Sequence, residues 1–170
     1  MSQKYRYKDW VIQKYVQGYS LDIGVGRLKH GDVGLDIYDY GEADVIVKPR
    51  EEYPFDDNTF DTVICSEVLE HSICYGFILD EAKRVLKPNG RLIISIPNSA
   101  NILYLLGIWK QPVSTGEDHM NYWSKNELMK VLNRENVKIE KFIPSWYRRK
   151  LYIPFLNTCN IFICSISSEK

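Results

Sequence analysis

Two glycines and an acid near the start of the chain have the residue types and the spacing needed to bind a nucleoside. Ser20 to Ile23 predicts a short buried strand, and Gly24-Val25-Gly26 follows it as a tight turn. A second predicted strand, Val33 to Ile37, carries Asp36 near its end. Glycines let the backbone approach a ligand closely, and a carboxylate at a strand tip can accept hydrogen bonds from both ribose hydroxyls. This stretch therefore predicts a nucleoside site.

The connection between these two strands is unusually short. Seven residues, Arg27 to Val33, follow the second glycine, where a crossover between parallel strands normally contains a helix. Seven residues extend for about 23 Å at most, which reaches a neighbouring strand but leaves no length for a full helix. We therefore expect the sheet to be thinly covered beside these strands, and to be shielded there by an N-terminal helix or by the partner in a homodimer.

Composition describes an ordinary globular protein. The 170 residues contain 45% hydrophobic and 26% charged residues, so residues 1–170 are expected to form a single domain. Lys and Arg total 22, as do Asp and Glu, and this balance argues against nucleic acid and anionic lipid as partners. The N-terminus lacks the apolar segment of a secretory signal, and the apolar window Ile102 to Trp109 is too short for a membrane span.

The cysteines indicate a reducing compartment. None of the four cysteines forms a C-x-x-C pair, which argues against zinc and disulfides and for buried thiols in a cytoplasmic protein.

Short apolar runs alternate with helical patterns along the chain, and this alternation predicts an α/β doubly wound sheet. Ser124 and Glu127 form the S-x-x-E capping box of one expected helix. Besides the two strands named above, the expected strands are Ala43 to Val47, Phe60 to Cys65, Leu92 to Ile96, Val137 to Ile143 and Asn160 to Ile166. The other expected helices are Lys4 to Val16, Gly76 to Leu86 and Ser99 to about Trp109, with a turn at Lys87-Pro88-Asn89-Gly90.

Five motifs occur in a recognisable order. They are Asp22-Ile23-Gly24-Val25-Gly26, Gly34-Leu35-Asp36, Tyr53 to Asp61, Ser66-Glu67-Val68-Leu69-Glu70-His71, and Arg84 to Leu92 with Ile96-Pro97-Asn98. The set resembles the class I S-adenosylmethionine-dependent methyltransferases of the small type-11 group, and a later pattern at His119 to Leu128 extends the resemblance. The resemblance implies a mostly parallel seven-stranded sheet of order 3-2-1-4-5-7-6 with the last strand antiparallel. Here the first crossover helix would be shortened or missing.

The resemblance also implies the cofactor, S-adenosyl-L-methionine, and a set of residues around it. Asp22 would fix the glycine turn or meet the amino acid moiety through water, and Asp36 would bind the ribose. Lys48 or Pro49 stands where the family usually has an acid for the adenine amino group, so Glu51 or a backbone amide near Arg50 would substitute. The expected cofactor-binding residues are Asp22, Ile23, Gly24, Val25, Gly26, Asp36, Ile37, Arg50, Glu51, Phe55, Ser66 and Glu67.

Two histidines are the candidates for chemistry on the acceptor side. His71 ends the L-E-H motif and His119 enters a segment that would cover the acceptor, and either could serve as a base for a hydroxyl acceptor. A packing role for each remains the alternative. The three histidines lack metal-ligand spacing, so the sequence predicts no metal.

Three functions stay open at this stage. The first is methyl transfer to a small-molecule or glycan-like acceptor. The second is a non-catalytic regulatory protein that binds the cofactor, which the missing acid at Lys48 or Pro49 would suit. The third is a methyltransferase acting on protein or nucleic acid, for which the basic and aromatic cluster at Trp146 to Tyr152 is the motivation. A dinucleotide dehydrogenase fits poorly, because the third fingerprint glycine and its helix are missing.

Overall fold

A seven-stranded sheet forms the centre of the protein in the computed structural model, which describes residues 7–101, 106, 119–145 and 158–166. The strand order is β3-β2-β1-β4-β5-β7-β6, as expected. The strands are β1 (Ser20–Ile23), β2 (Val33–Asp36), β3 (Val45–Ile46), β4 (Phe60–Ser66), β5 (Leu86–Pro97), β6 (Val137–Ser145) and β7 (Cys159–Ile166). The helices are α1 (Tyr7–Tyr15), the 3-10 turn η1 (Leu69–His71), α2 (Tyr75–Val85) and α4 (Lys125–Arg134).

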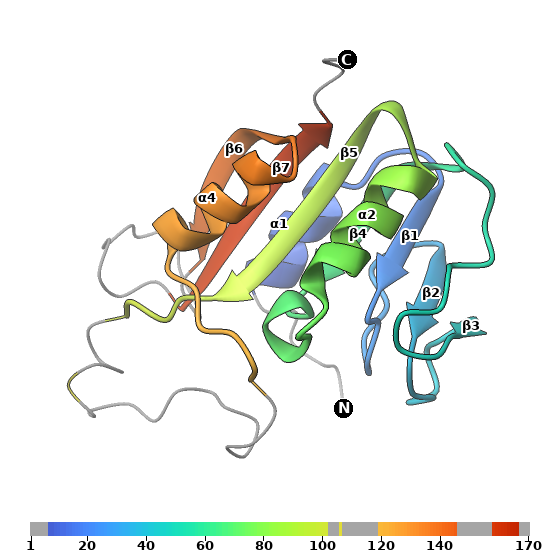
Figure 1. The fold of residues 1–170 in the computed structure, drawn as a ribbon, viewed down its shortest axis with the longest axis horizontal. Helices are drawn as coiled ribbons and strands as arrows, with labels where there is room; N and C mark the ends of the chain where they lie inside the picture. The colour runs from blue at the N-terminus through green and yellow to red at the C-terminus, as the bar shows by residue number, and fades with distance from the viewer. Residues whose placement is uncertain (1–6, 102–105, 107–118, 146–157, 167–170) are drawn as a thin grey trace.

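Strand direction brings the ends of the central strands together. β3, β2, β1, β4 and β5 pair in parallel, whereas β7 runs antiparallel to both β5 and β6. In Figure 1 the arrowheads of β1, β2 and β5 lie on the same side of the sheet, and β7 points the other way. The carboxyl ends of the parallel strands, where ligands of such sheets bind, therefore form one edge.

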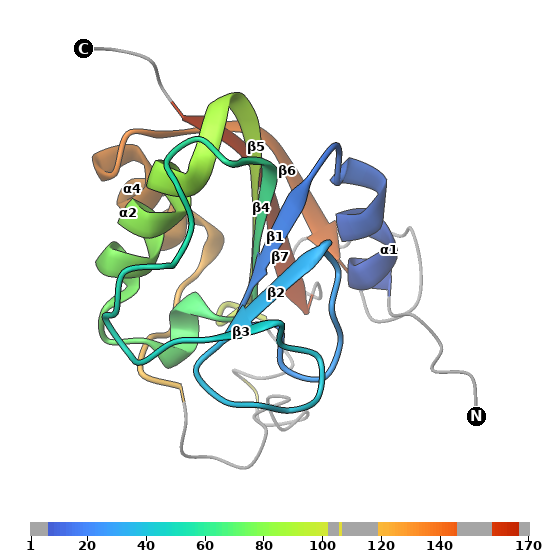
Figure 2. The ribbon, with the colours of Figure 1, turned by 90° about the vertical axis from the view of Figure 1, so that its right-hand side faces the viewer.

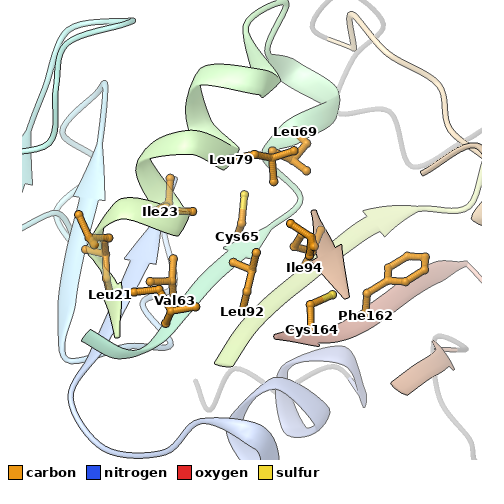
Figure 3. Packing of buried hydrophobic residues seen from close by; sticks show 14 of the residues in the cluster. Leu21, Ile23, Val63, Cys65, Leu69, Leu79, Leu92, Ile94, Phe162 and Cys164 are labelled. Atoms are coloured by element: carbon orange, nitrogen blue, oxygen red, sulfur yellow. The ribbon is translucent and has the colours of Figure 1, made fainter. Parts of the chain in front are cut away.

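The two faces of the sheet bury separate apolar clusters, with α1 on one face and α2 and α4 on the other (Figure 2). Alternate residues of each strand point to opposite faces. Val63 and Cys65 of β4 belong to the cluster beneath α2, shown in Figure 3, whereas Ile64 between them packs with Val11 and Ile12 of α1. Complete burial of one such side chain contributes about 1.5–3 kcal/mol, so both faces contribute to stability.

No helix connects β1 to β2, which confirms the shortened crossover. The connecting loop lies directly on β1: the Asp32 carboxylate accepts hydrogen bonds from the amide and hydroxyl of Ser20, at 2.9 and 2.7 Å. Its other side meets α1, because Gln13 Nε2 donates to the carbonyl of His30 at 2.8 Å. The loop and α1 together cover this part of the sheet, and the homodimer remains a prediction.

Several element boundaries differ from those expected. β5 begins at Leu86 instead of Leu92, and the predicted turn is an irregularity within it, where Asn89 has a φ of 64° and the pairing register with β4 shifts. β3 contains only two residues, Val45 and Ile46. The capping box of α4 is present as predicted. The expected helix does not begin at Ser99, because Ser99 and Ala100 form a turn; most of its remaining length and the basic aromatic cluster at 146–152 lie outside the described residues.

Candidate functional site

The glycine turn follows β1 at the carboxyl edge of the sheet and is folded back onto β2. Gly24 and Gly26 have φ values of 68° and 55°, a region that side chains disfavour. The amide of Gly24 donates to the carbonyl of Leu35 at 2.7 Å, and a side chain at Gly24 would clash with Val68. A Cβ at Gly26 would instead meet no atom within 4 Å. The turn therefore offers open space at its second glycine, where a ligand could approach the backbone.

Asp36 lies at the tip of β2 and binds the glycine turn. One carboxylate oxygen accepts from the amide of Gly26 at 2.8 Å, and the other accepts from the amides of Ile37 and Tyr38 at 2.7 and 3.1 Å. The residue is 7% exposed. A carboxylate has about four lone-pair sites, so these three bonds leave about one, on the oxygen that binds Gly26, for a ribose hydroxyl. Binding of ribose by Asp36 stays a prediction.

Asp22 fixes the loop that replaces the first crossover helix. Its Oδ2 accepts from the amide of His30 at 2.7 Å and lies 3.3 Å from Nδ1 of the same residue. The other ring nitrogen, Nε2, is 3.2 Å from Oδ1 of Asp9. Burial opposes the charged imidazole most strongly, but the hydrogen bonds and charges of Asp22 and Asp9 together outweigh it and raise the pKa of His30 to about 9. Asp22 thus holds the connecting loop at His30, whereas its predicted roles at the glycine turn and toward the amino acid moiety of the cofactor stay predictions.

The turn after β3 reaches across to the start of α2. Glu51 accepts a hydrogen bond from the amide of Lys48 at 2.7 Å, and Arg50 Nε donates to Cys74 Sγ at 2.8 Å. Arg50 adopts a φ of 64° in this turn. These residues therefore lie at the carboxyl edge, on the side where adenine was expected.

Phe55 does not lie at that edge. Its ring contacts Phe60, the first residue of β4, at a centroid distance of 5.0 Å, and Phe60 in turn stacks on Tyr19 before β1. Parallel strands begin at the edge opposite to the one at which they end, so Phe55 lies at the wrong end of β4 for the glycine turn. Phe55 was expected among the cofactor-binding residues, but the chain has crossed to the opposite edge of the sheet by this residue.

A buried lysine from α1 contacts Ser66 and Glu67 at the carboxyl end of β4. Lys8 Nζ donates to Ser66 Oγ at 3.1 Å and lies 2.9 Å from Oε2 of Glu67. Ser66 Oγ is also 2.9 Å from Ser95 Oγ of β5. Glu67 thus turns toward α1 and pairs with a cation. Sequence reasoning missed Lys8, because nothing in the sequence connects it with a serine 58 residues away.

His71, the last residue of η1, and His119 are far apart in sequence but lie against each other. Their ring centroids are 4.6 Å apart at an interplanar angle of 77°, and the ring of Tyr122 lies 5.8 Å from that of His119. Glu70 completes the group, since one ligand atom from each of Glu70, His71 and His119 lies within 4.8 Å of the others. Burial raises the pKa of Glu70 to about 8. Sequence reasoning missed Glu70, although the L-E-H motif contains it.

Comparison with known proteins decides the family. A family model for a methyltransferase domain matches residues 19–94. An uncharacterised protein of Methanocaldococcus jannaschii is 30% identical over 142 residues, covering 75% of this chain and 69% of that protein. A ubiquinone biosynthesis O-methyltransferase of Rickettsia bellii is 35% identical over 92 residues, covering 50% of this chain and 38% of that protein.

Solved structures agree with the sequence matches. A SAM-dependent methyltransferase of Thermotoga maritima, described as a possible histamine N-methyltransferase, superposes with a TM-score of 0.71 at 16% identity over 95% of both chains. The chain belongs to the class I S-adenosylmethionine-dependent methyltransferases. A methyltransferase from Haloferax volcanii, solved with its activator Trm112, superposes at 0.64 with 13% identity, over 95% of this chain and 89% of that one. At these identities the structural likeness shows the methyltransferase fold.

The chain spans less than half the length of several curated relatives. The methyltransferase chain spans 22%, 45% and 38% of the length of three curated relatives. The segment matched by the family model, 19–94, contains every predicted cofactor-binding residue, whereas His119 lies beyond it. None of the helices in the described ranges has the length and apolar character needed to span a bilayer.

Proposed function

We propose that this chain binds S-adenosylmethionine at the carboxyl edge of its sheet and transfers the methyl group to a small-molecule or glycan-like acceptor, through a hydroxyl oxygen. The observation that carries the proposal is the glycine turn locked to Asp36, with open space at Gly26 beside the buried carboxylate. The O-methyltransferases among the relatives favour oxygen as the accepting atom. We further infer a single domain over residues 1–170 and a cytoplasmic location.

In this proposal each part of the edge has a separate task. Gly24 and Gly26 admit the methionine and ribose portions, and Asp36 accepts from a ribose hydroxyl. The turn at Arg50 and Glu51 takes the adenine, and Ser66 and Glu67 lie below the sulfonium. The negative charge of Glu67 is balanced by Lys8. The positive sulfur would therefore be held by the orientation of the bound cofactor, and not by a net negative charge at Glu67.

The acceptor would approach from the side of His71 and His119. Methyl transfer is an in-line displacement in which the acceptor oxygen attacks the methyl carbon and the carbon–sulfur electron pair returns to sulfur. A hydroxyl acceptor must lose its proton, and the two imidazoles lie where they can assist that loss. The cluster of the two histidines therefore supports a hydroxyl acceptor over a more nucleophilic one.

Calorimetric titration of the cofactor tests the binding step. We expect the wild-type protein to bind S-adenosylmethionine in the micromolar range, and Asp36→Asn to bind about 10- to 100-fold more weakly, because the charged acceptor at the ribose is lost. Asp39→Asn is the matched control, since Asp39 is exposed and accepts from the amide of Gly41. Absence of heat and of any thermal stabilisation at high cofactor concentration would rule the proposal out.

A non-catalytic cofactor-binding protein is the second candidate, and the exposed Lys48 and Pro49 in place of an acid favour it. It predicts cofactor binding without methyl transfer to any acceptor in a broad screen of hydroxylated small molecules and glycans. Transfer to one acceptor at a rate well above background would exclude this candidate.

A further inference from the structure

Glu70, His71 and His119 form a compact group with the composition of a metal site. One potential ligand atom from each lies within 4.8 Å of the other two. Two imidazole nitrogens and one carboxylate suit zinc, iron(II), cobalt or manganese, whereas magnesium and calcium prefer oxygen ligands alone. Ligand atoms around such an ion at 2.0–2.2 Å are separated by about 3–4 Å, so small side-chain rotations would close the group.

The backbone holds the two histidines together before any ligand binds. The carbonyl of Glu70 accepts hydrogen bonds from the amides of Met120 and Asn121, at 2.7 and 3.0 Å. The side-chain amide of Asn121 donates to the carbonyls of Leu69 and Ser72, at 3.3 and 2.7 Å. These four bonds tie the segment that begins at His119 to η1. Metal sites need ligands positioned by such surrounding contacts.

The carboxylate of Glu70 is the independent sign that a ligand belongs here. The residue is 2% exposed, and neither Oε1 nor Oε2 has a hydrogen-bond partner within the described part of the chain. An ionised carboxylate buried without a partner costs several kcal/mol, so such groups are normally paired or bound to a metal. The positive charge of Lys8 acts on Glu70, but Lys8 forms its ion pair with Glu67. Among the residues that the structure describes, Glu70 therefore has no hydrogen-bonded or ion-paired group that compensates its charge.

We propose that Glu70, His71 and His119 bind one divalent transition-metal ion, with zinc as the best match. Three protein ligands leave at least one coordination position open, which is typical of catalytic rather than structural zinc sites. The sequence predicted no metal because the histidines are not closely spaced, and that argument fails once folding brings His119 beside His71.

The use of this ion rests on the proposed function. A hydroxyl acceptor bound at the open position would release its proton to solvent more readily, because the cation stabilises the negative oxygen. That oxygen then forms the new bond to the methyl carbon while the carbon–sulfur bond breaks and its electron pair goes to sulfur. Atoms and charge balance, with S-adenosylhomocysteine, the methylated acceptor and a proton as products. The substrate class is thus a hydroxylated acceptor that can ligate a metal.

Metal binding can be tested without any acceptor. The tag-free chain is stripped with a chelator and titrated with zinc, manganese and magnesium chlorides, and bound metal is counted by mass spectrometry. We expect one zinc ion per chain, at least 100-fold tighter than magnesium. Glu70→Gln and His119→Asn should each weaken zinc binding at least tenfold. Cys74→Ser is the matched control, because it removes a partly exposed thiol outside the group and should leave the affinity unchanged.

Thermal unfolding distinguishes a metal ligand at Glu70 from a buried acid that binds no metal. Without metal, Glu70→Gln should unfold at a temperature equal to or above that of the wild type, because a neutral amide is easier to bury. Zinc should raise the melting temperature of the wild type and not that of Glu70→Gln. Equal zinc affinity in the wild type and both ligand variants would overturn the proposal, as would less than half an equivalent of bound zinc.

Cofactor titration of the same stripped samples distinguishes the two proposals. Zinc binding without cofactor binding would leave the metal site standing and refute the proposed function. Cofactor binding without zinc binding would do the reverse. Cobalt substitution adds a spectroscopic check, since nitrogen ligands from His71 and His119 should give visible absorption that His119→Asn alters.

Discussion

Two crossover connections in this sheet cover the strands beneath them with different structures. The link from β1 to β2 is a polar loop without a helix, whereas the link from β4 to β5 contains η1 and the helix α2. The difference follows from the strand faces that they cover. Ser20 and Asp22 of β1 present polar groups to the loop, which bonds them directly, whereas Val63 and Cys65 of β4 present apolar groups to α2. Polar side chains need hydrogen-bond partners, and apolar ones need a covering surface.

The apolar crossover should be the more sensitive to loss of side-chain volume. Leu79 of α2 is 0% exposed, so we expect Leu79→Ala to lower the free energy of unfolding by about 3–4 kcal/mol, through lost burial and a cavity. Urea denaturation followed by circular dichroism measures the change. Ile73→Ala is the control, because Ile73 is 70% exposed and its replacement should cost under about 0.5 kcal/mol. Similar losses in both variants would contradict the assignment of α2 to the core.

The polar crossover should instead depend on pH through His30. Its pKa of about 9 exceeds the ordinary 6.5, so protonation stabilises the fold by up to about 3 kcal/mol. This stabilisation is fully present below pH 6.5, declines as the pH rises above it, and is lost above about pH 9. The difference in unfolding free energy between the wild type and His30→Gln, measured from pH 6 to 10, should show this decline. A constant difference would refute it.

Asp22→Asn tests the pairing from the other partner. The amide keeps an acceptor for the His30 backbone but loses the charge beside the imidazole, so we expect a loss of about 2 kcal/mol at pH 6. A double-mutant cycle with His30→Gln, by urea denaturation, should give a coupling energy of at least about 1 kcal/mol. Additive losses would show that the two side chains do not interact.

Gly31→Ala tests how closely the loop lies on β1. A Cβ at Gly31 would be 3.1 Å from the amide nitrogen of Asp22 and 3.2 Å from the carbonyl oxygen of Ser20, and these backbone atoms have little freedom to move. We expect a loss of about 1 kcal/mol, the smallest of the four effects. Gly76→Ala, in the helix of the other crossover, has open space and should be neutral or stabilising in the same assay.

Much of this fold was predictable because its signals are local. Short apolar runs identified the strands, Ser124 with Glu127 identified the start of α4, and the seven residues after Gly26 excluded a crossover helix. The exact strand ends were less accurate. β5 continues through a predicted turn, because Asn89 adopts a positive φ and the strand resumes its pairing beyond the bulge.

The residues of the candidate site also differ in whether local sequence or long-range packing positions them. The sequence alone determined the glycine turn, Asp36 and the order of the strands, because each depends on residues within one strand–turn unit or on motifs in a known order. Only the tertiary structure decided that Lys8 reaches Ser66, that Phe55 lies at the opposite edge, and that Glu70, His71 and His119 meet. Contacts between distant segments depend on how whole elements pack, and no periodicity or spacing in one sequence records that packing.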